Sequence, residues 1–219
     1  MSQHNITVQA GSSVRLLTAG KYCDRDIVVT AEGSGAGGQL DALLDGSLTS
    51  VASDVSKIRM YACRGIGTLI SVALPEANDI GSYAFNACGE METFRAPKVE
   101  TLGSYAFASC KKLTELLFPL LKTVPTYCFQ HCNALKKLDI GLAQSVGTYA
   151  FSNCTSLETI IVRRTAGVAT LSSSSFNSAE FDGYIYVPAA LMDSYKAANY
   201  WKTYATQFRA IEDYPDICG

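Results

Sequence analysis

Five consecutive segments of this 219-residue chain repeat at a spacing of 22 residues, with no gap between copies. One column of the repeat is aromatic throughout and consists of Tyr61, Tyr83, Tyr105, Tyr127 and Tyr149. Other apolar columns keep the same spacing and begin at Ile58, Cys63, Ile66 and Leu69. A repeat of about 20 to 29 residues with fixed apolar columns is typical of a solenoid, in which each turn packs only against its neighbours. Such a chain favours an extended binding surface over a reaction pocket.

Alternation of side chains predicts one short strand in each repeat. In the second copy, Phe94 and Ala96 are expected to point inward while Thr93 and Arg95 point outward. The predicted fold class is a leucine-rich repeat solenoid with an α/β-type repeat, a parallel β-sheet on one face and helical caps at both ends.

Composition and periodicity divide the chain into five parts. Strand-like segments at 6–8 and 26–30 indicate a small β unit, and the following glycines indicate a flexible linker. Leucines spaced by three and four residues before the first repeat predict a helix. The predicted parts are a small β unit (1–32), a Gly-rich linker (33–38), a helical N-cap (39–57), five repeats with a degenerate sixth (58–183), and a C-terminal strand with a helical cap, in which Trp201, Tyr204 and Phe208 continue a second helical piece (184–219).

Composition excludes several function classes. Charged residues make up 17% of the chain and the net charge is −2, so no overall field attracts nucleic acid or an anionic membrane. We expect no membrane insertion, because no apolar run reaches about 18 residues. The N-terminus has no secretory pattern. This absence is typical of a cytoplasmic protein, of one whose signal has been removed, or of one released by another route such as cell lysis. We nevertheless expect an extracellular, cell-surface or virion location.

The outward strand positions form the candidate partner-binding face. Stacked turns would bring these side chains onto one sheet surface, and apolar groups among charged ones favour recognition. The alternative is a face that is merely solvated. The candidate residues are Thr93, Arg95, Glu115, Leu117, Lys137, Asp139, Thr159 and Ile161, preceded by Ser71 and Ala73.

No cofactor, metal ion or catalytic residue is indicated. Cys128, His131 and Cys132 resemble a metal motif but provide three ligands, whereas a structural zinc site needs four. Cys132 also belongs to a column with Cys88, Cys110 and Cys154, which predicts buried, reduced thiols. Asp24 and Asp26 are expected to lie in a solvated turn, and a basic strip of Lys111, Lys112, Lys122, Lys136 and Lys137 lacks the interleaved aromatic residues of a nucleic-acid site.

The repeats resemble the BspA-type leucine-rich repeat family. The segments that carry the resemblance are IGSYAFNACGEMETFRAP (80–97), LGSYAFASCKKLTELLFP (102–119), VGTYAFSNCTSLETIIV (146–162) and, for the C-terminal cap, IYVPAALMDSYKAANYWKTYA (185–205). The resemblance covers residues 58–211. It implies a right-handed solenoid and a non-enzymatic role in binding host proteins or cells, with no catalytic residues to carry over.

A second, shorter resemblance concerns the N-terminal part. GKYCDRDIVVTAEG (20–33) and LDALLDGSLTSVASDVSKIR (40–59) resemble segments of phage and prophage tail-associated proteins of gut Firmicutes. Two functions are therefore predicted. The first is adhesion through the sheet face to a protein or glycan; the alternative is a structural part of a phage particle, with the solenoid as a spacer.

Overall fold

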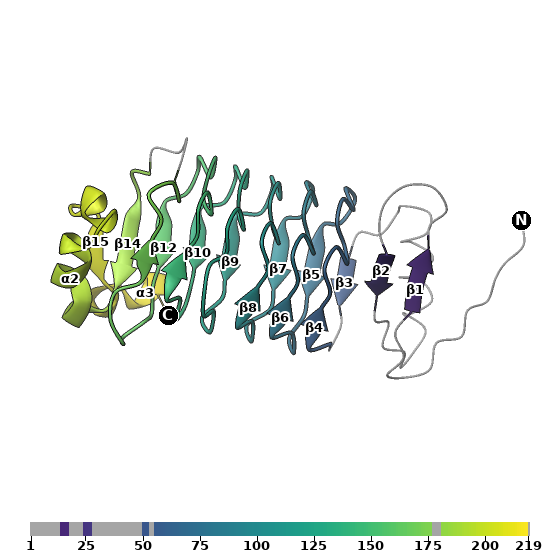
Figure 1. Cartoon of the computed structure of the whole chain (residues 1–219), viewed down its shortest axis with the longest axis horizontal. Coiled ribbons are helices and arrows are strands. Elements are labelled where there is room, and N and C mark those ends of the chain that lie inside the picture. The colour runs from purple at the N-terminus through teal and green to yellow at the C-terminus, as the bar shows by residue number, and fades with distance from the viewer. Residues whose placement is uncertain (1–13, 18–23, 28–49, 53–54, 177–180, 219) are drawn as a thin grey trace, which may run out of the picture.

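The solenoid predicted from the repeats is present. The structure is a computed structural model that describes residues 14–17, 24–27, 50–52, 55–176 and 181–218 (Figure 1). Each turn contributes one short strand to a parallel face, and within the repeats the paired residues keep the spacing of the repeat, as in Lys137 with Thr159. The strands of this face are β3 (Ser50–Ala52), β5 (Ser71–Ala73), β7 (Thr93–Arg95), β9 (Glu115–Leu117), β10 (Lys137–Asp139), β12 (Thr159–Ile161), β14 (Tyr184–Val187) and β15 (Phe208–Ala210).

The return side of each turn contains two-residue strands and turns. The strands are β4 (Lys57–Ile58), β6 (Asp79–Ile80), β8 (Thr101–Leu102), β11 (Ser145–Val146) and β13 (Thr170–Leu171). Residues 55–176 contain no helix, which differs from the α/β-type repeat expected from the sequence. The reason is visible in the backbone: the N–H groups of Tyr83, Phe85 and Ala87 donate to carbonyls of the next turn. An α-helix would require those groups to bond within their own segment.

The core is a stack of the predicted columns. Phe94 and Ala96 are buried and Thr93 and Arg95 are exposed, and the equivalent inward pairs of the other four repeats are buried as predicted. Phe107 is fully buried and lies between Phe85 and Phe129, with ring centroids 5.6 and 6.0 Å away. Because each apolar group meets its equivalent in the neighbouring turns, one buried column runs the length of the repeats.

One glycine has a clear structural requirement. Gly141 has φ +54°, and a Cβ there would lie 2.3 Å from the Phe118 carbonyl oxygen. The prolines Pro75, Pro97 and Pro119 occupy the equivalent place in earlier repeats. The fourth repeat therefore leaves its strand through a tight left-handed turn that only glycine adopts without strain.

The described part of the predicted N-terminal helix is not helical. β3 pairs with β5 and β4 pairs with β6, so these residues add a turn to the solenoid in place of the helix expected over 39–57. Val51 and Val55 pack against the core. A strand satisfies the open backbone edge of β5, which a helix cannot do. Residues 39–49 and 53–54 lie outside the described part of the chain.

The N-terminal region contains one described hairpin. β1 (Val14–Leu17) pairs antiparallel with β2 (Asp24–Ile27), and Val14 is opposite Ile27. β2 overlaps the strand expected at 26–30, whereas the partner at 14–17 was not expected from the sequence. The predicted strand at 6–8 and the linker at 33–38 lie outside the described residues.

The C-terminal part mixes helices with a strand. After β14 come η1 (Ala189–Leu191), α2 (Met192–Ala197) and η2 (Trp201–Tyr204), and these precede β15. Trp201 and Tyr195 are fully buried against the last turns, and the Trp201 indole donates to the Ala169 carbonyl. The second helical piece expected through Phe208 ends earlier, because Phe208 belongs to β15 and pairs with Ile185. The chain continues into η3 (Ile211–Asp213) and α3 (Pro215–Cys218).

Candidate partner-binding face

The predicted face is divided into two halves. Toward the N-terminus the outward side chains reach solvent: Thr93, Arg95, Glu115 and Leu117 are exposed, and 39% of the Leu117 surface is accessible. Ala73 is also exposed and Ser71 is half-buried. We call these six residues the open half. They lie on β5, β7 and β9, so neighbouring turns present them side by side.

Two of the predicted face residues are buried. Asp139 is 1% exposed and Ile161 is fully covered, although both occupy outward positions of their strands. Lys137 and Thr159, on the same strands, are half-buried. The expectation that Asp139 and Ile161 contribute to an exposed face was therefore wrong. We call Asp139, Ile161 and Tyr186 the covered half.

The cover is the C-terminal segment, residues 211–218, which comprises η3 and α3. Ile161, Tyr186 and Cys218 form a separate buried cluster, against which Ile211 and Ile217 pack. The Tyr214 ring meets the Tyr186 ring edge-on at 5.3 Å. In Figure 1, α3 lies beside β10 and β12 although β15 precedes it in the chain. The segment thus doubles back from the last strand over the earlier ones.

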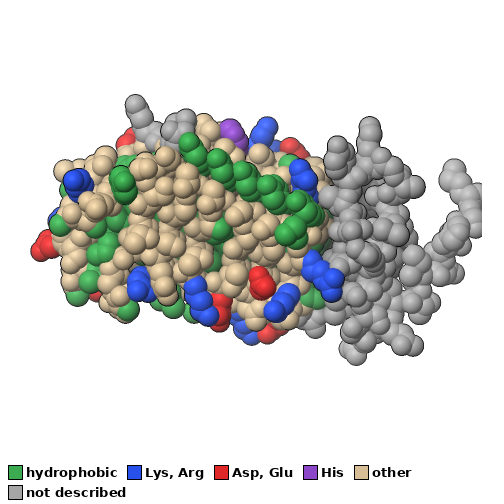
Figure 2. Space-filling view, in the orientation of Figure 1, with side chains coloured by type: hydrophobic (Ala, Val, Ile, Leu, Met, Phe, Trp, Pro, Cys, Tyr) green, Lys and Arg blue, Asp and Glu red, His purple; other side chains and the backbone are tan. Residues whose placement is uncertain are grey.

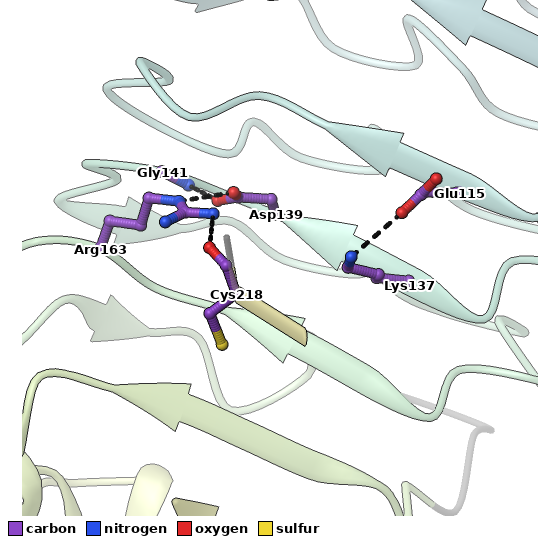
Figure 3. Close-up of polar contacts among 6 residues, drawn as sticks. All are labelled: Glu115, Lys137, Asp139, Gly141, Arg163 and Cys218. Atoms are coloured by element: carbon purple, nitrogen blue, oxygen red, sulfur yellow. Dashed lines mark hydrogen bonds and ion pairs between the residues drawn. The ribbon is translucent and has the colours of Figure 1, made fainter. Parts of the chain in front are cut away.

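An ion pair between the half-buried Arg163 and the buried Asp139 anchors this cover. The Asp139 carboxylate accepts from Arg163 Nε at 2.6 Å and from the Gly141 N–H at 2.8 Å (Figure 3). The other arm of the Arg163 guanidinium donates to the Cys218 carbonyl. Arg163 therefore links the sheet to the C-terminal segment. Sequence alone offered no signal for this link, because Arg163 and Cys218 are separated by 55 positions.

The open half contains a hollow at a break in the sheet. β3, β5 and β7 form one sheet and β9, β10, β12, β14 and β15 form another. The residue after the strand donates to the next turn at Leu74, Phe118, Ile140 and Val162, but in the described structure Ala96 makes no such bond. A hollow of about 270 Å³ lies at this break, lined by Phe94, Arg95, Ala96, Pro97, Glu115 and Leu117.

Three of the five lysines of the predicted basic strip form ion pairs with carboxylates of the preceding turn. Lys112 pairs with Glu90 at 2.6 Å and Lys122 with Glu100 at 2.5 Å, in each case one turn earlier. Lys137 of the face pairs with Glu115 at 3.2 Å (Figure 3). The hydrogen bond that Lys112 donates to the Glu90 carboxylate raises the pKa of Lys112, which holds its proton more firmly. Alternating charge of this kind offers no continuous positive surface to a phosphate backbone.

The cysteine column forms a ladder of buried thiols. Cys88, Cys110, Cys132 and Cys154 are buried, and each Sγ donates to a backbone carbonyl 25 positions earlier at 3.0–3.2 Å. Burial raises the pKa of the Cys110, Cys132 and Cys154 thiols, and it brings the pKa of Cys154 to about 12. Protonated thiols that donate inward are neither nucleophiles nor metal ligands. Among the described residues no group of His, Cys, Asp and Glu is arranged to hold a metal ion, the segment from Cys128 to Cys132 included.

The tyrosine column is a half-buried ladder. Neighbouring rings stack with centroids 4.7–5.1 Å apart, and every tyrosine has a positive φ. In Figure 2, a continuous row of hydrophobic side chains crosses successive turns on the face in view. Burial is the main cause that raises the pKa of the Tyr105 phenol, and the neighbouring phenols of Tyr127 and Tyr83 raise it further. Tyr83, Tyr105 and Tyr127 have a ring stacked on each face, so these inner rings leave no face on which a base or sugar could stack.

Among the described residues, the candidates for catalysis lie on separate elements. His131 occupies a left-handed turn position, φ +59°, equivalent to Ala87 and Ser109. Asp24 and Asp26 lie on β2, and His4 is outside the described residues. None of the described helices has the length and apolar content to cross a membrane.

Comparison with known proteins identifies the repeats. A family model described as "BspA type Leucine rich repeat region (6 copies)" matches residues 56–182, more than half of the chain. Proteins of this repeat class are commonly binding modules and typically have no enzymatic activity. No curated protein matches the chain. The resemblance of residues 20–33 and 40–59 to phage tail-associated proteins therefore stays a prediction.

A solved structure with a similar fold supports this assignment. The chain is similar to a Treponema pallidum leucine-rich repeat protein, with 18% identity, a TM-score of 0.51, and coverage of 69% of this chain and 83% of that one. A leucine-rich repeat protein from Bacteroides ovatus has 16% identity, a TM-score of 0.41, and coverage of 84% and 55%. The period, the stacked columns and the match over residues 56–182 agree, and the chain belongs to the BspA-type leucine-rich repeat family.

Proposed function

We propose that this protein is a non-enzymatic recognition module whose open half binds a protein or glycan on a cell surface or in a virion. The observation that carries the proposal is Leu117, an exposed apolar side chain beside Arg95 at the rim of a hollow. The covered half, built on the same strand positions, is already occupied by the chain's own C-terminal segment.

Leu117 is not needed for the core, which supports a role in binding. Its neighbours Leu116 and Phe118 point inward and are fully buried, whereas Leu117 points outward. Complete burial of a leucine side chain stabilises a complex by about 1.5–3 kcal/mol. An exposed leucine among charged residues is therefore a plausible anchor for a partner.

The scaffold favours binding without a large ordering penalty. The turns that carry the open half stack on one another through buried columns and inter-turn hydrogen bonds. A preformed surface loses little conformational entropy when a partner docks. Exposed polar groups of the open half, such as Thr93 and Glu115, can then fix the orientation of the partner.

The test is binding of the labelled chain to bacterial and epithelial cells. An Arg95→Glu/Leu117→Ser double variant is expected to lose binding while its melting curve stays unchanged. Lys111→Glu is the matched control, because Lys111 is exposed in a turn outside the strands and the change in charge is the same. The control should bind like the wild type.

Two results would contradict the proposal. One is a wild-type chain that binds none of these surfaces. The other is a double variant that folds and binds as well as the wild type, which would place the contact elsewhere on the molecule.

A further inference from the structure

A single row of outward residues crosses both halves of the face. It consists of the third residue of β5, β7, β9, β10 and β12 and the equivalent residue of β14. Strand register aligns Ala73 with Arg95 on one side of the sheet break, and aligns the members from β9 to β14 on the other. Across the break, Leu117 occupies the position one repeat after Arg95. Equivalent residues on adjacent strands lie roughly 4.8 Å apart. We call this row the outward track; its members are Ala73, Arg95, Leu117, Asp139, Ile161 and Tyr186.

The covered half of the outward track already holds a peptide, the chain's own C-terminal segment. The last three members of the track are covered by the C-terminal segment, a short peptide stretch with the sequence IEDYPDIC. Two kinds of contact hold that peptide. Its apolar side chains pack against Ile161 and Tyr186, and its Cys218 carbonyl accepts a hydrogen bond from the Arg163 guanidinium. The covered half therefore binds a peptide by combining an apolar anchor with an arginine.

The open half offers the same two kinds of group, and none of the described residues covers them. Leu117 supplies the apolar anchor and Arg95 the guanidinium, and both line the hollow at the break in the sheet. Arg163 has a carboxylate from the track itself, Asp139, whereas the track neighbours of Arg95 are Ala73 and Leu117. Glu115 also lines the hollow, but its carboxylate pairs with Lys137. Among the described ion pairs, Arg95 takes part in none.

We propose that the open half of the outward track binds an acidic–apolar peptide segment of a partner protein. A carboxylate of the partner pairs with Arg95, and a neighbouring aliphatic or aromatic side chain fills the hollow beside Leu117. This inference rests on the proposed function and narrows its partner from protein or glycan to a peptide. We place the carboxylate on the partner, because an arginine pairs best with a carboxylate that accepts two hydrogen bonds. The track neighbours of Arg95 are Ala73 and Leu117, which carry no carboxylate.

The probe is a library of random dodecapeptides displayed on phage. The library is selected on the full chain and depleted on the Arg95→Glu/Leu117→Ser variant, so that only binders of the open half survive. The surviving sequences are expected to share Asp or Glu within two positions of Ile, Leu, Val, Phe or Tyr.

A synthetic peptide with the consensus sequence then gives the affinity by fluorescence anisotropy. Arg95→Glu should weaken binding by about tenfold or more, since it replaces attraction by repulsion. Replacing the acid of the peptide by its amide should have a similar effect on the wild-type chain. Lys111→Glu, which carries the same change of charge, should leave the affinity within about twofold.

Other outcomes would overturn the inference. It fails if no peptide survives depletion, if the survivors are basic, or if amide peptides bind as tightly as acidic ones. It also fails if bound peptide shifts the NMR signals of residues 211–218 instead of 93–97 and 115–117, because the peptide would then replace the C-terminal segment. Cell binding that needs Arg95 and Leu117 without any peptide selection would overturn this inference alone and leave a glycan partner.

Discussion

The two halves of the sheet face are built on the same backbone, yet they differ in what surrounds their outward side chains. In the open half, Leu117 and Arg95 reach solvent; in the covered half, Ile161 and Asp139 are buried beneath residues 211–218. The inward side chains do not differ in this way, because Leu116 and Ile160 are both fully buried. The repeat therefore sets the interior of the solenoid, while a non-repeated segment decides which part of its exterior is available.

The largest expected effect tests the interior that both halves share. Phe107→Ala should lower the free energy of unfolding by roughly 3–5 kcal/mol, since it empties a fully buried ring site. The ring of Phe107 also contacts Phe94, 4.8 Å away, under the open half. Urea unfolding followed by circular dichroism measures the loss. A variant as stable as the wild type would mean that the phenylalanine column is not the core.

The second prediction compares one ion pair from each half. Asp139→Asn should lower the free energy of unfolding by about 2 kcal/mol, because it leaves the partly solvated Arg163 without its buried carboxylate. Glu115→Gln breaks the more exposed pair with Lys137 and should change stability by less than about 1 kcal/mol. Urea titrations of both variants in one buffer give the comparison. Equal losses would mean that the cover over Asp139 is not formed in solution.

The third prediction uses thiols as local reporters. Cys218 lies in the C-terminal segment and Cys110 in the column of the core, and burial raises the pKa of both. Alkylation therefore requires opening, and a short terminal segment opens at lower free energy than the stacked turns do. Iodoacetamide labelling read by mass spectrometry should modify Cys218 at least about tenfold faster, a difference of ~1.4 kcal/mol. Faster labelling of Cys110 would reverse the assignment of core and cover.

The same thiols predict a dependence on pH. A thiol with a raised pKa in the folded chain keeps its proton after the unfolded thiol, whose pKa is about 8.5, has ionised. The folded state then holds more protons, so its stability is complete below that value and falls as pH rises toward about 12, the pKa of Cys154. Urea midpoints at pH 7 and pH 10 check the sign. Greater stability at pH 10 would contradict the buried-thiol ladder.

The smallest expected effect is on the stability of a Leu117→Ser variant. Because Leu117 points into solvent, the change should alter the free energy of unfolding by no more than about 0.5 kcal/mol. Ile161→Ser, at the same strand position in the covered half, should be clearly destabilising. Thermal melts of the pair measure this contrast directly. Equal effects would remove the distinction between the halves.

Much of the fold could be predicted because it repeats. The 22-residue period and the alternation at Phe94 and Ala96 identify the inward columns, and the structure buries them. The ends were harder, since no period constrains them. Val51 of the expected N-terminal helix lies on a strand that pairs with β5, and Phe208 lies on β15. At both places a strand satisfies the open backbone edge of its neighbour, β5 or β14. This hydrogen bonding outweighs the spacing of apolar residues that predicted a helix.

The sequence by itself determined the solenoid, its inward columns, the buried cysteine column and the set of outward positions, because each depends on contacts between residues one turn apart. Only the tertiary structure decided which outward positions are accessible, where the sheet breaks between β7 and β9, and that Arg163 holds Asp139 and the Cys218 carbonyl together. Those features depend on contacts that do not recur from turn to turn. One joins Arg163 to Cys218, 55 positions away, and the other feature is the missing strand pairing between β7 and β9. A periodic pattern contains no information about either.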